Sequence, residues 1–330
     1  MGPRKKSANA AGSDPRDPFT NPRNPRSSRD SRITEQRNPR TADIDLASHL
    51  EIVDLIAAED RRVPEAVHGQ REQIARAMEV AETTFRKGGR LIYVGAGTSG
   101  RLGVLDASEM PPTYGTDPEM VQGVIAGGYA ALTRSQEGAE DVLDNAVRDL
   151  DERRVSSADF VVGIAASGTT PYVRRALEHA RSVGARTALV ACSPPPAETA
   201  AAADIVILPV TGPEVVTGST RMKAGTATKL VLNTITTGAM IRLGKTFGNL
   251  MVDLRATNEK LRDRSARIVM EVCAVDRQDA RALIERAGGV VKTAIVMHFL
   301  GVERADAERA LADAGGIIRK AIGRNPPPVL

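Results

Sequence analysis

The middle of the chain alternates short apolar runs with stretches in which apolar residues recur every three or four positions. This alternation is typical of strands linked by crossover helices, and it predicts a doubly wound α/β fold with a five-stranded parallel sheet. In such sheets, ligands bind beyond the carboxyl ends of the strands. The strands are expected at Leu91–Val94, Val121–Ile125, Phe160–Ile164, Thr187–Ala191 and Ile205–Val210, with crossover helices at Val142–Leu150 and Tyr172–Val183.

Helical patterns also flank the predicted sheet. Before it, apolar residues at helical spacing begin near Leu46, and a second amphipathic stretch runs from about Val63 to Phe85. After the last strand, a long helix is expected over Ser219–Leu243. Short helices separated by glycines then predict a small helical module: Asp276–Ala287, Val290–Phe299, Ala305–Ala314 and Ile317–Ile322. The expected organisation is an extension over 1–32, N-terminal helices over 33–89, the sheet domain over 90–262 and the helical module over 263–330.

The basic residues are concentrated near the N-terminus. The 330-residue chain carries a net charge of +4, but its first 40 residues hold ten Lys/Arg and four Asp/Glu, so the remaining 290 carry −2. The expected folded part therefore has no excess positive charge for nucleic-acid binding. Residues 1–32 are rich in Pro, Arg, Ser and Asn, and we expect them to be disordered because they have little to bury.

Several other classes of protein are disfavoured. No apolar run reaches the roughly 18 residues of a membrane span, and the first 40 residues lack the apolar core of a signal peptide. Cys192 and Cys273 lie far apart in apolar runs, and the chain has only four His, so a metal cage is not expected. We expect a cytoplasmic protein with two buried thiols and no metal.

Three loops rich in hydroxyl groups stand out. Two of them directly follow predicted strands, and the third precedes the long helix. Each alone is commonly a turn or a helix cap, but three loops at one edge of a sheet can hold a phosphate with hydroxyls and helix N-termini. The hydroxyl side chains are those of Thr98, Ser99, Ser167, Thr169, Thr170, Ser219 and Thr220.

The first loop also fits a dinucleotide fingerprint. Gly95, Gly97 and Gly100 have the GxGxxG spacing. The acidic residue that usually follows the second strand is missing, because that strand runs into Ala126-Gly127-Gly128. We therefore favour a phosphate monoester over a dinucleotide.

Carboxylates near these loops could serve as acid and base. Glu109 precedes the pair Pro111-Pro112, which we interpret as a break after a loop, and Glu140 follows the second strand. The spacing alone does not single out these two over neighbouring carboxylates, which are Asp106, Glu137 and Asp141.

The longest motifs resemble the N-acetylmuramic acid 6-phosphate etherase family, which is built on the sugar-isomerase (SIS) fold. They are VGAGTSGRLGVLDASEMPPTYG, GIAASGTTPYV and EVVTGSTRMKAGTATKLVLNTITTGAMIRLGKTFGNLMVDLRATNEKLRDR. The resemblance extends from about Ile33 to Arg319, including the opening TEQRNPRTADID. Motifs of this length and order are highly specific.

The resemblance implies a reaction and a set of roles. The family cleaves the D-lactyl ether of N-acetylmuramic acid 6-phosphate to N-acetylglucosamine 6-phosphate and D-lactate, without a metal or redox cofactor. By motif, Glu109 would protonate the leaving oxygen and Glu140 would remove or return the C2 proton. Glu259 matches a carboxylate that assists ring opening in related SIS enzymes. A homodimer and a part in reusing bacterial cell-wall amino sugars are also implied.

Two alternatives stay open. An SIS-type isomerase would share the phosphate loops without needing both glutamates, and a non-catalytic sensor like the glucokinase regulatory protein would bind the sugar phosphate without turning it over. The sequence also departs from many relatives at Thr169, where they carry a basic residue. Phosphate contact there is then expected through a hydroxyl or a backbone amide.

Overall fold

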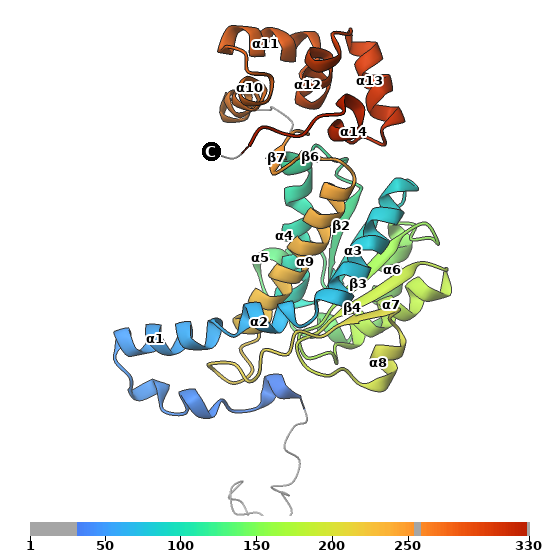
Figure 1. The fold of residues 1–330 in the computed structure, drawn as a ribbon. Helices are drawn as coiled ribbons and strands as arrows, with labels where there is room; N and C mark the ends of the chain where they lie inside the picture. The colour runs from blue at the N-terminus through green and yellow to red at the C-terminus, as the bar shows by residue number, and fades with distance from the viewer. Residues whose placement is uncertain (1–31, 254–258, 329–330) are drawn as a thin grey trace, which may run out of the picture.

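The computed structural model describes residues 32–253 and 259–328, so the expectation for the first 31 residues lies outside the described part. A five-stranded parallel sheet with strand order β2-β1-β3-β4-β5 forms its centre (Figure 1), which confirms the predicted fold class. The strands are β1 (Leu91–Gly95), β2 (Val121–Ile125), β3 (Phe160–Ile164), β4 (Arg186–Val190) and β5 (Ile205–Ile207). The last strand is three residues shorter than predicted, because Pro209 has no N–H for a ladder hydrogen bond.

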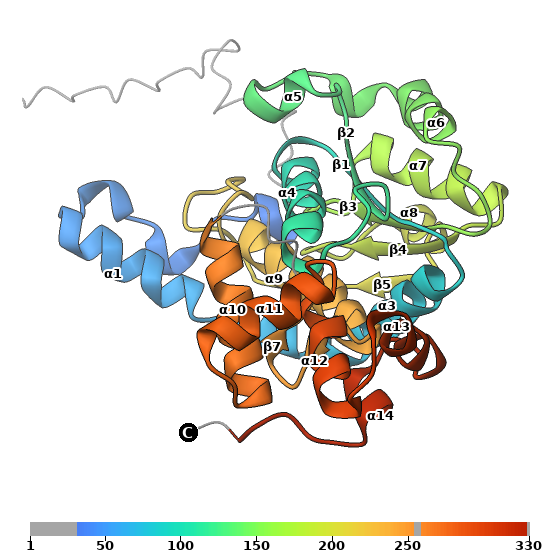
Figure 2. The same cartoon turned by 90° about the horizontal axis from the view of Figure 1, so that it is seen from above.

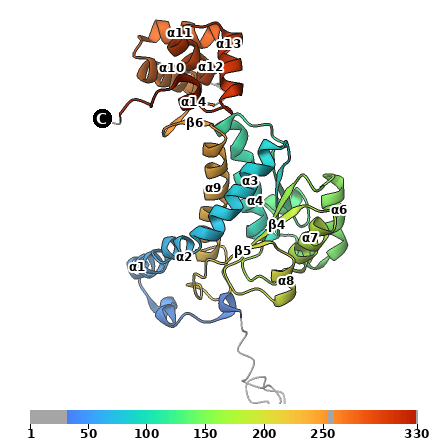
Figure 3. The same cartoon turned by 45° about the vertical axis from the view of Figure 1, so that its right-hand side comes forward.

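Helices cover both faces of the sheet (Figures 1 and 3). Alternate strand residues point to opposite sides, so that Tyr93 packs in one core and Ile92 in the other. The Tyr93 face is covered by α3 (Arg71–Arg86), α4 (Gly97–Tyr114) and α9 (Lys223–Arg242), and the Ile92 face by α6 (Leu143–Glu152) and α7 (Pro171–Ser182). Both faces of the sheet are therefore shielded from water, as is usual for a parallel sheet.

The N-terminal part is less regular than predicted. It contains three 3-10 turns, η1 (Ile33–Glu35), η2 (Pro39–Thr41) and η3 (Ile44–Leu46), followed by α1 (His49–Asp60) and α2 (Val63–His68). The expected single helix to Phe85 is divided into α2 and α3. In all three overall views α1 projects from the body (Figures 1–3), and its Leu50 is 71% exposed.

The C-terminal helices have a hydrophobic core of their own, near the C-terminal end of α9 (Figure 1). The four predicted helices are confirmed to within one residue at each end, and α10 precedes them as a helix that the sequence analysis did not identify. The elements are β6 (Thr246–Phe247), β7 (Leu250–Met251), α10 (Glu259–Cys273), α11 (Arg277–Arg286), α12 (Val291–Leu300), α13 (Arg304–Asp313) and α14 (Ile318–Ile322). Within the described ranges, no helix is long and apolar enough to cross a membrane.

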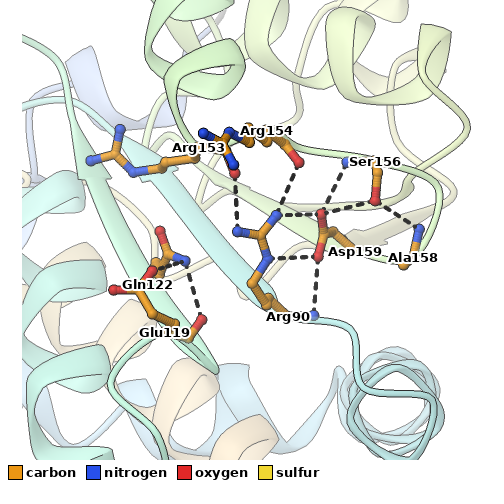
Figure 4. Close-up of polar contacts among 8 residues, drawn as sticks. All are labelled: Arg90, Glu119, Gln122, Arg153, Arg154, Ser156, Ala158 and Asp159. Carbon is orange, nitrogen blue, oxygen red and sulfur yellow. Dashed lines mark hydrogen bonds and ion pairs between the residues drawn. The ribbon is translucent and has the colours of Figure 1, made fainter.

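A network of hydrogen bonds and an ion pair links the segments that precede β1 and β3, at the amino-terminal edge of the sheet (Figure 4). Arg90, just before β1, donates to the buried carboxylate of Asp159, just before β3, with Nη2–Oδ2 at 2.8 Å. The same guanidinium donates to the carbonyl oxygens of Arg153 and Arg154 at 3.0 and 3.1 Å. Burial alone would raise the pKa of Asp159, but Arg90 and the Ser156 N–H lower it overall. This network therefore lies at the edge opposite the carboxyl ends of the strands.

Candidate functional site

A cavity of about 490 Å³ opens at the carboxyl edge of the sheet. It brings together the two strand-following loops, the loop before α9 and the N-terminal segment. Six of the seven predicted hydroxyl residues line it, and Ser219 does not. The lining residues are Arg32, Glu35, Ala96, Gly97, Thr98, Ser99, Glu140, Asp141, Ala166, Ser167, Thr169, Thr170, Pro171, Gly218 and Thr220.

The first loop presents the N-terminus of α4 to the cavity. The residue before the helix is Ala96, which has no side-chain group to cap the first N–H groups. Thr98 and Ser99 lie in the first turn, so hydroxyls and uncapped N–H groups point to the same place. Glycine is required at Gly95 because a Cβ there would lie 2.7 Å from the backbone nitrogen of Gly100.

The second loop forms a compact cluster of hydroxyls before α7. The Oγ of Ser167 lies 2.8 Å from Oγ1 of Thr169, and it also accepts a hydrogen bond from the Thr169 N–H at 3.3 Å. Thr170 precedes the helix without capping it through its side chain. Gly168 has φ +74°, and a Cβ there would meet Pro195 at 2.8 Å. The turn is therefore held tightly while its hydroxyls remain within reach of a ligand.

The third loop works differently, because the N-terminus of α9 is already occupied. The buried carboxylate of Glu214 accepts hydrogen bonds from the N–H groups of Lys223 and Ala224, at 3.1 and 2.9 Å. Burial raises the pKa of Glu214, while these two donors oppose the shift. This loop therefore offers the Thr220 hydroxyl and the backbone at Gly218 rather than a helix N-terminus.

Of the two predicted catalytic glutamates, Glu140 lines the cavity and Glu109 does not. Glu140 belongs to the short turn η4 (Ala139–Asp141), with Asp141 beside it. The expectation that Glu109 lies on a loop was wrong, since it is an exposed residue of α4. Pro111 and Pro112 fall in the last turns of this helix, where they cost few hydrogen bonds, and Gly115 ends it.

Glu109 is also far from the cavity of its own chain. It follows Gly97 by twelve residues, which is about 18 Å along a helix axis and more than a glutamate side chain can span. Its exposed side chain lies one turn after Leu105, which is 50% exposed. Within one chain, Glu109 is therefore too far along α4 to belong to the lining of this cavity.

The predicted ring-opening residue, Glu259, lies elsewhere. It is the first residue of α10, in the module near the other end of α9 (Figure 1). There it lines a separate cavity of about 830 Å³ with Arg262 and Asp263. In the described structure, Glu259 is not part of the hydroxyl-lined cavity.

Arg32 and Glu35 also line the cavity, although neither belongs to the predicted site residues. Both residues belong to the N-terminal segment, which contacts a loop about 180 residues later in the chain. At this contact, the Gly218 N–H donates a hydrogen bond to the Thr34 carbonyl oxygen at 3.2 Å. For Glu35, the one sequence signal was its place in the opening motif TEQRNPRTADID, and no local pattern shows which loop this motif contacts.

Comparisons with known proteins identify the type of domain and the family of relatives. Residues 73–181 match the family model for the glucokinase regulatory protein N-terminal SIS domain. The chain is 57% identical over 262 residues to an N-acetylmuramic acid 6-phosphate etherase of Rhodopirellula baltica, covering 79% of this chain and 86% of that protein. It is 56% identical over 263 residues to one of Gloeobacter violaceus, covering 80% and 86%. A solved phosphoheptose isomerase from Neisseria gonorrhoeae matches 58% of this chain and 98% of its own, at 19% identity and a TM-score of 0.43.

Proposed function

Since this chain belongs to the N-acetylmuramic acid 6-phosphate etherase family, we propose that its hydroxyl-lined cavity is the place where the ether is cleaved. The observation that carries this proposal is the meeting of three hydroxyl-bearing loops and the Glu140 carboxylate in one cavity. The hydroxyls and the N-termini of α4 and α7 suit the phosphate, and the carboxylate suits proton transfer at the sugar carbons.

The proposed chemistry needs an acidic proton beside the bond that breaks. In the open-chain sugar, the C1 aldehyde acidifies the C2 proton, and Glu140 removes it. The electron pair forms a C2–C3 double bond as the C3–O bond breaks, and an acid protonates the departing oxygen, which gives D-lactate. Water then adds at C3 while a proton returns to C2, which completes N-acetylglucosamine 6-phosphate. A positioned proton-transfer group contributes about 10²–10⁴-fold to such a rate.

The acid is proposed to be Glu109 of the partner subunit in a homodimer. Glu109 is too far along α4 to act in its own cavity, yet it lies on an exposed face with Leu105. The projecting N-terminal arm, which comprises η3 and α1, adds the exposed side chains of Leu46, Leu50 and Val53. Apolar surface of this kind commonly marks a protein interface. A second copy that covers these faces would exclude water and supply the missing carboxyl group.

The direct experiment is a lactate assay with the purified full-length protein and N-acetylmuramic acid 6-phosphate. We expect release of D-lactate by the wild type and a loss of at least about 10²-fold in the Glu140→Gln variant. Glu137→Gln is the matched control, because that side chain is exposed and does not line the cavity. Full turnover by Glu140→Gln would contradict the proposed role.

The match to the glucokinase regulatory protein domain suggests one alternative function, that of a non-catalytic sensor. A non-catalytic sensor would bind the sugar phosphate in the same cavity and release no lactate. It would also have no need for a carboxylate beside the phosphate loops, which this chain has in Glu140. The same assay therefore separates the two functions.

We also propose that the protein works in the cytoplasm. Cys192 and Cys273 are both buried and unpaired, as is usual for thiols in a reducing compartment. A cytoplasmic etherase would act on sugars that are already phosphorylated, which fits a role in reusing cell-wall amino sugars.

A further inference from the structure

The N-terminal segment before α1 forms one wall of the cavity. Its backbone and side chains are bonded to the loops that follow β4 and β5. The Ile33 N–H donates to the Oγ of Ser193 at 3.1 Å, and the Thr41 hydroxyl donates to the Val215 carbonyl oxygen at 2.8 Å. Asn38 donates to the Pro213 carbonyl oxygen at 3.2 Å. Thr34, Asn38, Thr41 and Ser193 are all buried, so this wall is a fixed part of the fold.

This wall places the carboxylate of Glu35 at the cavity surface. Its Oε1 accepts a hydrogen bond from the Thr34 hydroxyl at 3.4 Å, which is long for such a bond. Its Oε2 lies against Gly218, where a Cβ would be 3.5 Å from it. Both Glu35 and Gly218 line the cavity. The carboxylate is thus held beside the third hydroxyl-bearing loop, and among the described residues most of its accepting capacity is unused.

A carboxylate at this place suits only some groups of a sugar phosphate. It repels a phosphate, which needs the donors that Thr220 and the other loops supply. It is a strong acceptor for a hydroxyl group, and a sugar phosphate carries hydroxyls close to the carbon that bears the phosphate. Glu35 would therefore distinguish a sugar phosphate from a bare phosphate.

We propose that Glu35 is a substrate-binding residue that accepts a hydrogen bond from a sugar hydroxyl near the phosphate-bearing end. The inference rests on the proposed function only in taking the ligand of this cavity to be a sugar phosphate. It assigns a role to a residue outside the glutamate pair and the hydroxyl loops. It also gives the N-terminal wall a function in selecting the ligand.

The test compares two ligands in the full-length protein. Binding of N-acetylglucosamine 6-phosphate and of inorganic phosphate is measured by calorimetry for the wild type, Glu35→Gln and the control Glu65→Gln. Glu65 is an exposed residue of α2 outside the cavity. The amide keeps the shape but loses the charge, so we expect sugar-phosphate affinity to fall about tenfold in Glu35→Gln while inorganic phosphate affinity stays within about twofold. Glu65→Gln should change neither.

Two outcomes would overturn the proposal. Unchanged sugar-phosphate affinity in Glu35→Gln would show that no hydroxyl depends on this carboxylate. A parallel loss for both ligands would show that Glu35 only supports the loop at Gly218. If Glu35→Gln does not fold, Glu35→Asp replaces it, with the same selective loss expected because the shorter side chain withdraws the carboxylate. A wild type that binds the sugar phosphate but releases no lactate would refute the etherase function alone.

Discussion

The Nζ of Lys223 lies 2.5 Å from Oε2 of Glu59, and neither side chain is more than 3% exposed. Glu59 also accepts hydrogen bonds from the Arg40 guanidinium, with Nη2–Oε2 at 2.9 Å. Glu59 is near the end of α1, and Lys223 begins α9 directly after the third loop of the cavity. This buried pair therefore joins the projecting N-terminal arm to a loop that lines the site.

Replacing the lysine should destabilise the protein strongly. Lys223→Met removes one of the two cationic partners of a buried carboxylate, so its cost should approach, but stay below, the roughly 3–5 kcal/mol of leaving a buried charge wholly unpaired. Urea unfolding would measure the change in the free energy of unfolding. The control is Lys229→Met on the exposed side of the same helix, which should cost less than about 0.5 kcal/mol. A loss below about 1 kcal/mol in Lys223→Met would mean that the pair contributes little.

The Glu59 carboxylate also predicts an acid-sensitive stability. The hydrogen bond from Arg40 is the largest cause that lowers the pKa of Glu59 to about 2 from an ordinary 4.5. A group with a depressed folded-state pKa stabilises the fold fully above its unfolded pKa, and this stabilisation is lost as the pH falls through the folded value. We expect unfolding free energy to decline between about pH 4.5 and 2. Glu59→Gln should decline less over this range, and an identical decline would contradict the assignment.

The tight turn after β1 should not tolerate a side chain. In Gly95→Ala the new Cβ would lie 2.7 Å from the Gly100 nitrogen, and the helix start would have to move. Overpacking of this kind costs about 1–3 kcal/mol, and it should also weaken inorganic phosphate binding in titration calorimetry. Gly69→Ala is the control, because its Cβ would meet ordinary contacts at 3.4 and 3.5 Å. Equal phosphate affinity in both variants would exclude this turn from the phosphate site.

Much of the fold could be predicted because its signals are local. The runs Val121–Ile125 and Phe160–Ile164 are rich in β-branched residues and bounded by turns, and the structure has strands with these same bounds. Local signals failed where tertiary context decided the outcome. The pair Pro111-Pro112 looked like a break, but α4 continues through both residues to Tyr114.

The candidate site could be predicted in part for a similar reason. Thr98 and Ser167 follow strands of one parallel sheet, so topology alone brings their loops to the same edge. Glu35 could not be found in this way, since its place depends on contacts with a loop about 180 residues later in the chain. The distance of Glu109 from the cavity also follows only from its position along a helix.

Mixing two inactive variants tests whether the site is shared between chains. Glu109→Gln and Glu140→Gln homodimers should each be nearly inactive. If subunits exchange, half of the dimers are mixed, and each mixed dimer has one site with both glutamates intact. Lactate release should then recover to about a quarter of the wild-type rate. Because a site within one chain would lack a glutamate in every subunit, absence of recovery despite proven exchange would contradict a shared site.

Removal of the C2 proton by a base in the hydroxyl-lined cavity is the central step of the proposed mechanism, and isotope incorporation measures that step directly. The wild type is allowed to cleave N-acetylmuramic acid 6-phosphate in D₂O, and the sugar product is analysed by NMR and mass spectrometry. We predict deuterium at C2 in nearly every molecule of N-acetylglucosamine 6-phosphate, and no such exchange with Glu140→Gln. A product that keeps its original hydrogen at C2 would show that the ether is broken without proton abstraction there, and would contradict the mechanism.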